Sequence, residues 1–144
     1  MLLIFIISII IYIIAGVMIY YNMYNYDKLI KIKMIVSGFI IVFIITVIIC
    51  FISTGGINAN VKYISIARNA SILIFAPINA IISLPYISNT FNKYKDKRIN
   101  QTELKKRILI FSIILIFVLI FEIGYIEDFE TGIINSAISN KSLE

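Results

Sequence analysis

The stretch MIVSGFIIVFIITVIICFI, residues 34–52, decides the fold. It contains no charged residue, and its isoleucine, valine and phenylalanine side chains would lie on all sides of a helix. Each of these residues favours insertion into a bilayer by about 0.3 to 0.6 kcal/mol near the membrane centre. A surface helix of a soluble protein keeps a polar face. This stretch therefore predicts a helix that crosses a membrane.

Three more apolar runs lie on either side of it. Residues 2–21 carry no charge, and about 20 apolar residues are enough to cross a hydrocarbon core roughly 30 Å thick. Residues 69–90 mix proline, serine and asparagine with apolar residues, and residues 108–126 are almost wholly apolar until Glu122. We therefore expect an all-α membrane protein with one membrane domain, residues 1–144, and no soluble domain. Its four transmembrane helices are expected at about 2–21, 34–52, 69–90 and 108–126.

The composition agrees with a membrane protein and excludes several kinds of site. The chain is 60% hydrophobic and 15% charged, with a mean hydropathy of +0.98, which is far from a soluble domain. It has no histidine and one cysteine, Cys50. Histidine-based haem, zinc and catalytic-triad sites and a disulfide within the chain are therefore excluded, and we expect no cofactor and no bound metal.

The positive charges predict the orientation. Ten of the 13 Lys and Arg residues lie in the expected loops 22–33 and 91–107. By the positive-inside rule both loops are cytoplasmic and both termini lie outside. The ten are Lys28, Lys31, Lys33, Lys93, Lys95, Lys97, Arg98, Lys105, Lys106 and Arg107, and the other three are Lys62, Arg68 and Lys141.

The basic loops also indicate which partners the chain has. They flank apolar runs at the membrane surface, where each Lys or Arg is attracted to anionic lipid by about 1 kcal/mol. We expect anionic lipid there and no nucleic acid. The many isoleucine, asparagine, lysine and tyrosine residues indicate an AT-rich genome. We therefore expect a prokaryotic plasma membrane, with an organelle membrane as the alternative.

Glu122 is the one acidic residue within an expected span. A carboxylate at the bilayer centre costs about 2.5 to 3.5 kcal/mol on insertion scales, so such acids are candidates for function. Glu122 is only about four residues, roughly 6 Å, from the expected end of its helix. The alternative is that it reaches the headgroups, or that the helix ends there.

The helix expected at 69–90 carries four more candidates. Asn79 and Ser83 are four residues apart and form a small polar face, which favours close packing between helices. Pro77 and Pro85 would kink the helix and leave backbone carbonyls without partners, as in helices that line transport sites. Structural kinks of this kind are also frequent in membrane helices.

Beyond residue 126, the acidic residues Asp128 and Glu130 are expected outside the membrane. They could hold a hard cation, although their spacing is not that of a calcium loop. The alternative is a solvated tail.

The second half of the chain resembles VanZ-like membrane proteins in part. Asn69 precedes Phe75-x-Pro77, and Glu122 precedes Asp128-x-Glu130, with Asn135 beyond. VanZ-like proteins carry an Asn-to-Phe-x-Pro helix and a later acidic stretch that ends in Asn. The chain lacks the glycine after the proline and the arginine before the acids. The resemblance implies a cell-envelope role near the outer face, with these residues as its site.

Three classes of function remain open on the sequence. The first is a non-catalytic accessory protein or subunit of a larger membrane complex, with other membrane subunits as partners. The second is a small transporter or channel that assembles with copies of itself, with Asn79 and Glu122 along the path. The third is a membrane enzyme of the outer face that uses Glu122, Glu127, Asp128 or Glu130 as acids or metal ligands. We favour the first class, which needs no catalysis.

Overall fold

The computed structural model describes residues 2–141, with side chains described to Ser139. Four α-helices and one short 3-10 turn form in the order α1 (Leu2–Asn22), α2 (Lys28–Ser53), η1 (Thr54–Gly56), α3 (Val61–Lys95) and α4 (Gln101–Lys141). No strand occurs among residues 2–141. All four helices are long and apolar enough to cross a membrane. The expected all-α fold with four helices is confirmed, and it is consistent with an integral membrane protein.

Three helices extend beyond the apolar runs that predicted them. α2 begins at Lys28, so the three lysines expected in a loop lie in its first turns. α3 adds residues at both ends. α4 continues through residues 127–130, where an acidic tail was expected, and ends at Lys141. Hydropathy marks only the part of a helix that lies in hydrocarbon. Lys, Arg and Glu continue the helix into the aqueous region because they are good helix formers.

Side-chain caps define where the two long helices begin. The Asn60 side chain accepts a hydrogen bond from the Lys62 backbone N–H at 3.0 Å, at the start of α3. The Asn100 side chain accepts one from the Glu103 backbone N–H at 2.8 Å, at the start of α4. An asparagine cap satisfies a backbone donor that the helix itself leaves unpaired. The Asn100-x-x-Glu103 pattern therefore starts α4 before its apolar run.

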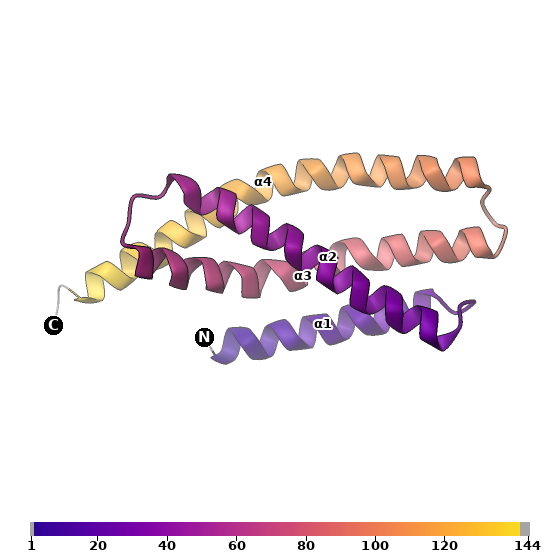
Figure 1. Cartoon of the computed structure of the whole chain (residues 1–144), viewed down its shortest axis with the longest axis horizontal. Helices are drawn as coiled ribbons and strands as arrows, with labels where there is room; N and C mark the ends of the chain where they lie inside the picture. Colours follow the sequence, from indigo (N-terminus) through magenta and orange to yellow (C-terminus); the bar gives the residue numbers. More distant parts are fainter. Residues whose placement is uncertain (1, 142–144) are drawn as a thin grey trace.

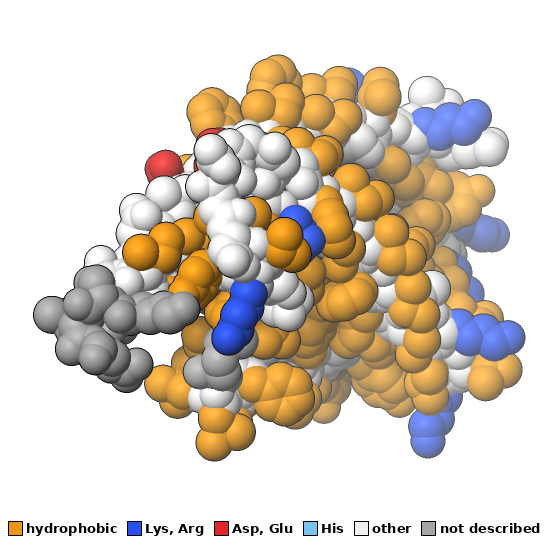
Figure 2. All heavy atoms as spheres, turned by 60° about the vertical axis from the view of Figure 1, so that its left-hand side comes forward, with side chains coloured by type: hydrophobic (Ala, Val, Ile, Leu, Met, Phe, Trp, Pro, Cys, Tyr) orange, Lys and Arg blue, Asp and Glu red, His pale blue; other side chains and the backbone are white. Residues whose placement is uncertain are grey.

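α3 is the centre of the bundle. It makes extensive contacts with each of the other three helices, and α1 packs on α3 far more than on α2. The α1–α2 and α3–α4 connections lie at one end, and the two termini and the α2–α3 connection lie at the other (Figure 1). Hydrophobic side chains cover most of the face in Figure 2, and Lys and Arg side chains gather at the end that holds the α1–α2 and α3–α4 connections.

Small residues explain why α3 takes the central place. Its buried residues have short side chains, which let the three neighbouring helices approach closely. The other helices bury much less of themselves and expose large isoleucine, leucine and phenylalanine side chains, as helices in contact with lipid do. The small buried residues of α3 are Ala67, Ala70, Ser71, Ala76, Ala80, Ser83 and Ser88.

The two prolines lie inside α3 without ending it. Pro77 has no N–H to donate to the carbonyl of Leu73, four residues before it. In the structure the Ser8 hydroxyl of α1 lies within hydrogen-bond distance of the Leu73 carbonyl. Near the other end of α1, the Asn22 side chain donates to the Pro85 carbonyl at 3.0 Å. Backbone carbonyls beside both prolines are therefore used to attach α1.

Gly38 provides a test of the α2–α3 contact. A Cβ atom at this position would lie 3.0 and 3.2 Å from the two methyl carbons of Leu84. We expect Gly38→Val to lower the free energy of unfolding in detergent by about 1–3 kcal/mol, the usual cost of overpacking. Gly124→Val is the control, because nothing lies within 4 Å of a Cβ there. Equal stability of the two variants would contradict this packing.

Candidate functional site: an acid and an amide between helices

One face of α4 carries two acids toward the rest of the bundle. Glu122, Ile126, Glu130 and Ile134 are all buried. Residues four apart lie on the same side of a helix, so the four form one stripe against α2 and α3. The expected end of the helix near residue 126 was wrong, and both acids lie in the continuous part of α4.

Glu122 is held by hydrogen bonds from the central helix. The Asn79 side-chain N–H₂ donates to both carboxylate oxygens, at 2.9 and 3.1 Å. The same nitrogen lies 3.2 Å from the Thr46 hydroxyl oxygen of α2, which accepts from it. Thr46 can accept because its own proton goes to the Val42 carbonyl at 3.0 Å. α2, α3 and α4 therefore meet at one buried polar point.

Neighbouring side chains fix this arrangement. The Ser83 hydroxyl donates to the backbone carbonyl of Asn79 at 2.6 Å, one turn further along α3. Ala76 and Ala80 beside it are fully buried, so the backbones of the helices come close. Only 6% of Asn79 and 8% of Glu122 are exposed. A carboxylate buried to this degree in hydrocarbon needs such a donor, since an unpaired buried charge is costly.

A groove between α3 and α4 leads to Glu122. It has a volume of about 300 Å³, and Asn79 and Glu122 contribute its polar atoms. The groove opens on the surface of the bundle, because large parts of its rim residues Phe121, Tyr125 and Ile82 are exposed. The other lining residues are Phe75, Ile78 and Val118. The acid is therefore buried against the bundle and reachable from the side.

Glu130 occupies a second buried position two turns further along α4. None of it is exposed, and neither carboxylate oxygen has a hydrogen bond among the described residues. Ser71 and Arg68 of α3 lie near it. Each has another partner, because the Ser71 hydroxyl donates to the Ala67 carbonyl at 3.1 Å and the Arg68 guanidinium donates to Thr54.

Arg68 closes this end of the bundle. Its Nη2 donates to the Thr54 hydroxyl at 2.8 Å, and its guanidinium lies over the Phe51 ring, 3.8 Å from the ring centre. A buried apolar layer that includes Cys50 and Ile126 lies on the same side of the bundle. The two acids of the stripe therefore have different surroundings: Glu122 has an amide and a groove, and Glu130 lies near a guanidinium.

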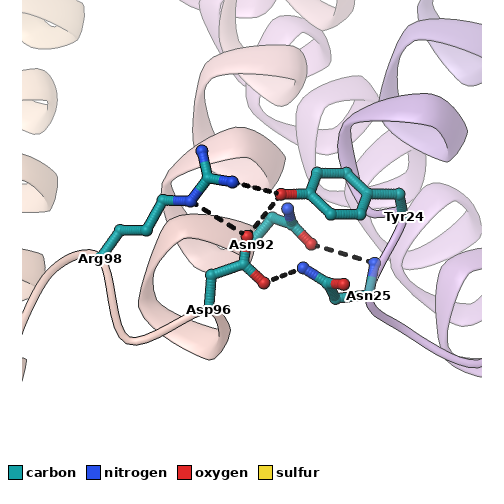
Figure 3. A network of polar contacts seen from close by, with 5 residues as sticks. All are labelled: Tyr24, Asn25, Asn92, Asp96 and Arg98. Carbon is teal, nitrogen blue, oxygen red and sulfur yellow. Dashed lines mark hydrogen bonds and ion pairs between the residues drawn. The ribbon is translucent and has the colours of Figure 1, made fainter.

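A third polar cluster joins the two connections at the opposite end of the bundle (Figure 3). The Asp96 carboxylate accepts hydrogen bonds from the Tyr24 hydroxyl and the Asn25 side chain, and it forms an ion pair with Arg98 at 3.4 Å. Asn92 accepts from the Asn25 backbone N–H at 3.3 Å. We call these five residues the loop cluster. It attaches the α1–α2 connection to the end of α3.

The end of α3 positions the loop cluster. Lys97 has a φ of 57°, and the backbone N–H groups of Lys97 and Arg98 donate back to the carbonyls of Tyr94 and Lys93. This is the Schellman pattern that ends many helices. It turns the chain just after Asp96, so Asp96 and Arg98 both reach Tyr24.

Tyr26 lies next to this cluster, between α1 and α2. Its hydroxyl donates to the Phe91 carbonyl at 3.3 Å. Burial raises the pKa of Tyr26 above 10.0, and the charge of Asp96 and the nearby Tyr94 raise it further. The phenol therefore stays protonated and keeps its hydrogen bond at physiological pH.

The structure brings some of the predicted site residues together and leaves others apart. Asn79 and Glu122 are in direct contact, and Ser83 supports them from α3. Glu130 is buried, so it is not part of a solvated tail. Asp128 is exposed and lies on another side of α4. α1 binds the Leu73 carbonyl, one turn before Pro77, and the carbonyl of Pro85 itself. Neither proline lines the groove at Glu122.

Sequence reasoning missed Thr46 and the loop cluster. Thr46 is the one hydroxyl residue in the middle of the apolar run 34–52, which is a usable signal for an interhelical hydrogen bond. The loop cluster joins residues about 70 positions apart, and nothing in the local sequence indicates such a pairing. Among the described residues, no three His, Cys, Asp or Glu side chains are grouped closely enough to hold a metal ion.

Comparison of the chain with known proteins identified no similar protein. No protein-family model matches the chain, and neither a curated protein nor a solved structure is significantly similar to it. The partial resemblance to VanZ-like proteins therefore receives no support from these comparisons. Function has to be argued from the geometry alone.

The contact between Asn79 and Glu122 can be tested with a double-mutant cycle. We expect Asn79→Leu to lower the free energy of unfolding by about 1–3 kcal/mol, because it leaves a buried carboxylate without its donor. Adding Glu122→Leu should recover part of this loss, since replacing both partners removes the unpaired group. Ser65→Ala, at an exposed position of α3, is the control. Losses that simply add in the double variant would contradict the contact.

If the loop cluster holds the two connections in place, its loss should increase their local opening. Asp96→Ala removes the acceptor shared by Tyr24, Asn25 and Arg98. We expect faster amide hydrogen exchange in residues 23–27 and 96–99, with little change in the middle of the helices. Asp27→Ala is the matched control, because Asp27 precedes α2 without a side-chain capping bond. Unchanged exchange in Asp96→Ala would show that the cluster does not hold the connections.

Proposed function

We propose that this chain is a non-catalytic subunit or accessory protein of a larger membrane complex, and that α4 carries its contact surface. The observation that carries the proposal is how little the bundle covers α4. In the most apolar 18-residue stretch of α4, 6% of the stretch is buried inside the bundle. In the corresponding stretch of α3 the buried share is 44%. The central helix is enclosed, whereas α4 is attached by one stripe.

The outer face of α4 is broad, apolar and partly aromatic. It lies opposite the buried stripe of Glu122 and Ile126. Phe117 is 60% exposed, and the aliphatic residues around it are exposed to a similar degree. Aromatic side chains are enriched in protein–protein interfaces. The aliphatic residues of this face are Leu109, Ile113, Ile116 and Ile120.

The length of α4 supports the same role. Its 41 residues span about 60 Å at 1.5 Å per residue, about twice the roughly 30 Å of the hydrocarbon core. The helix therefore offers contact surface both within the membrane and beyond it. Other membrane subunits are the partners that fit such a surface, and we propose a multi-pass protein of a prokaryotic plasma membrane.

The charge distribution supports an orientation and a lipid partner. The connections α1–α2 and α3–α4, with the lysines that flank them, lie at one end of the bundle (Figure 1). We propose that this end is cytoplasmic and that both termini lie outside, following the positive-inside rule. Anionic lipid headgroups at this end would neutralise its Lys and Arg side chains.

A small homo-oligomeric transporter or channel is the second candidate. Buried polar groups follow α3 over most of its length, with Ser71, Asn79, Ser83, Ser88 and Asn92 all on its covered side. These groups could form part of a path if copies of the chain rearranged around α3. In the present bundle Asn79, Ser88 and Asn92 have hydrogen-bond partners outside α3. The Ser71 and Ser83 hydroxyls donate to backbone carbonyls of α3 itself. This pairing favours the accessory role.

The accessory role predicts partners in particles extracted from the native membrane. We expect native nanodiscs taken from the protein's own host to contain other membrane proteins in fixed ratio, measured by native mass spectrometry. A photo-cross-linking residue at Phe117 should capture one of them, whereas the same residue at Ile13, 60% exposed on α1, should capture lipid. Particles that contain only copies of this chain would contradict the accessory role and favour the transporter or channel.

A further inference from the structure

The groove between α3 and α4 has the size and lining of a small-molecule site. Its volume of about 300 Å³ is at the lower end of the range for small-molecule sites. Such sites combine apolar walls with a few polar groups that fix the orientation of a ligand. Here the polar groups are Glu122 and Asn79, and both are more than nine-tenths buried.

Glu122 has accepting capacity left. A carboxylate offers about four lone-pair positions, and one amide group of Asn79 serves both oxygens. The ion pairs of the described chain join Arg98 to Asp96 and Arg107 to Glu103, so Glu122 is not neutralised by a basic side chain there. A ligand that enters the groove meets an acid that lacks a positive partner.

The residues that line the groove favour one class of cation over another. Three aromatic side chains, Phe75, Phe121 and Tyr125, line it with aliphatic residues. Phe75 is held in place by an edge contact with Phe129, with ring centres 6.2 Å apart. Aromatic faces attract organic ammonium groups. A hard metal cation would instead need six or more oxygen ligands, which these walls do not supply.

We propose that the α3–α4 groove binds a monovalent organic cation with an apolar arm, such as an amine or quaternary ammonium that partitions into lipid. The positive group lies against the Glu122 carboxylate, and the arm lies among Phe121, Tyr125 and Ile82. The rim of the groove is exposed on the side of the bundle, so the cation enters from the bilayer. This site does not depend on the accessory role, because the chain supplies all of it.

The test measures binding of radiolabelled benzyltrimethylammonium to the purified protein in nanodiscs of zwitterionic lipid, so that anionic headgroups do not compete. We expect saturable binding above empty discs, and at least about tenfold weaker binding in Glu122→Gln, since tenfold corresponds to about 1.4 kcal/mol. Gln keeps the size of the side chain and, through its amide oxygen, one of the two hydrogen bonds that Asn79 donates. The matched control Glu127→Gln, at an exposed acid on another side of α4, should bind like the unmodified protein.

Two further measurements separate this site from a merely apolar groove. Neopentylbenzene, the uncharged analogue of the same shape, should compete at least about tenfold more weakly than the unlabelled cation. Phe121→Leu, at a position 70% exposed, leaves the Glu122 contact intact and should weaken binding several-fold through the lost aromatic face. Any of three results would overturn the proposal. The first is no saturable binding, and the second is unchanged affinity in Glu122→Gln or Phe121→Leu. The third is equal competition by the uncharged analogue.

Discussion

Hydrocarbon offers no hydrogen-bond partner, and the bundle is organised by this constraint. Each polar group that enters the membrane must find its partner on another helix or on its own backbone. α3 carries most of these groups, and it lies where all three other helices can reach it. Ser8 and Asn22 of α1, Thr46 of α2 and Glu122 of α4 all make hydrogen bonds to α3. The polar residues therefore favour particular helix neighbours, and the apolar residues make each helix apolar enough to cross a membrane.

The number of helices was predictable because hydropathy depends on local composition. Uninterrupted runs such as residues 34–52 have no soluble alternative. Helix ends were less predictable: α4 reaches Lys141 although its apolar run ends near residue 126, because a helix outside hydrocarbon no longer needs apolar residues. The arrangement of the helices depends on contacts between residues far apart in the chain, and a single sequence does not reveal these.

The candidate site shows the same division. Asn79 and Glu122 could each be singled out as polar residues in apolar surroundings, and their chemistry pointed to interhelical contact. That they bind each other required the three-dimensional arrangement, as did the burial of Glu130, whose local sequence Glu127-Asp128-Phe129-Glu130 reads as solvated. Helical periodicity alone places Glu130 on the same face as Glu122. It does not show that this face is covered.

The attachment of α1 to α3 also has consequences for how the protein is made. Helices leave the ribosome in chain order, so α1 and α2 reach the membrane before α3 does. The carbonyls that Ser8 and Asn22 bind both belong to α3, so α1 has no final position until the third helix has been inserted. Although α1 is the first helix of the chain, two of its interhelical hydrogen bonds therefore form only once α3 is present.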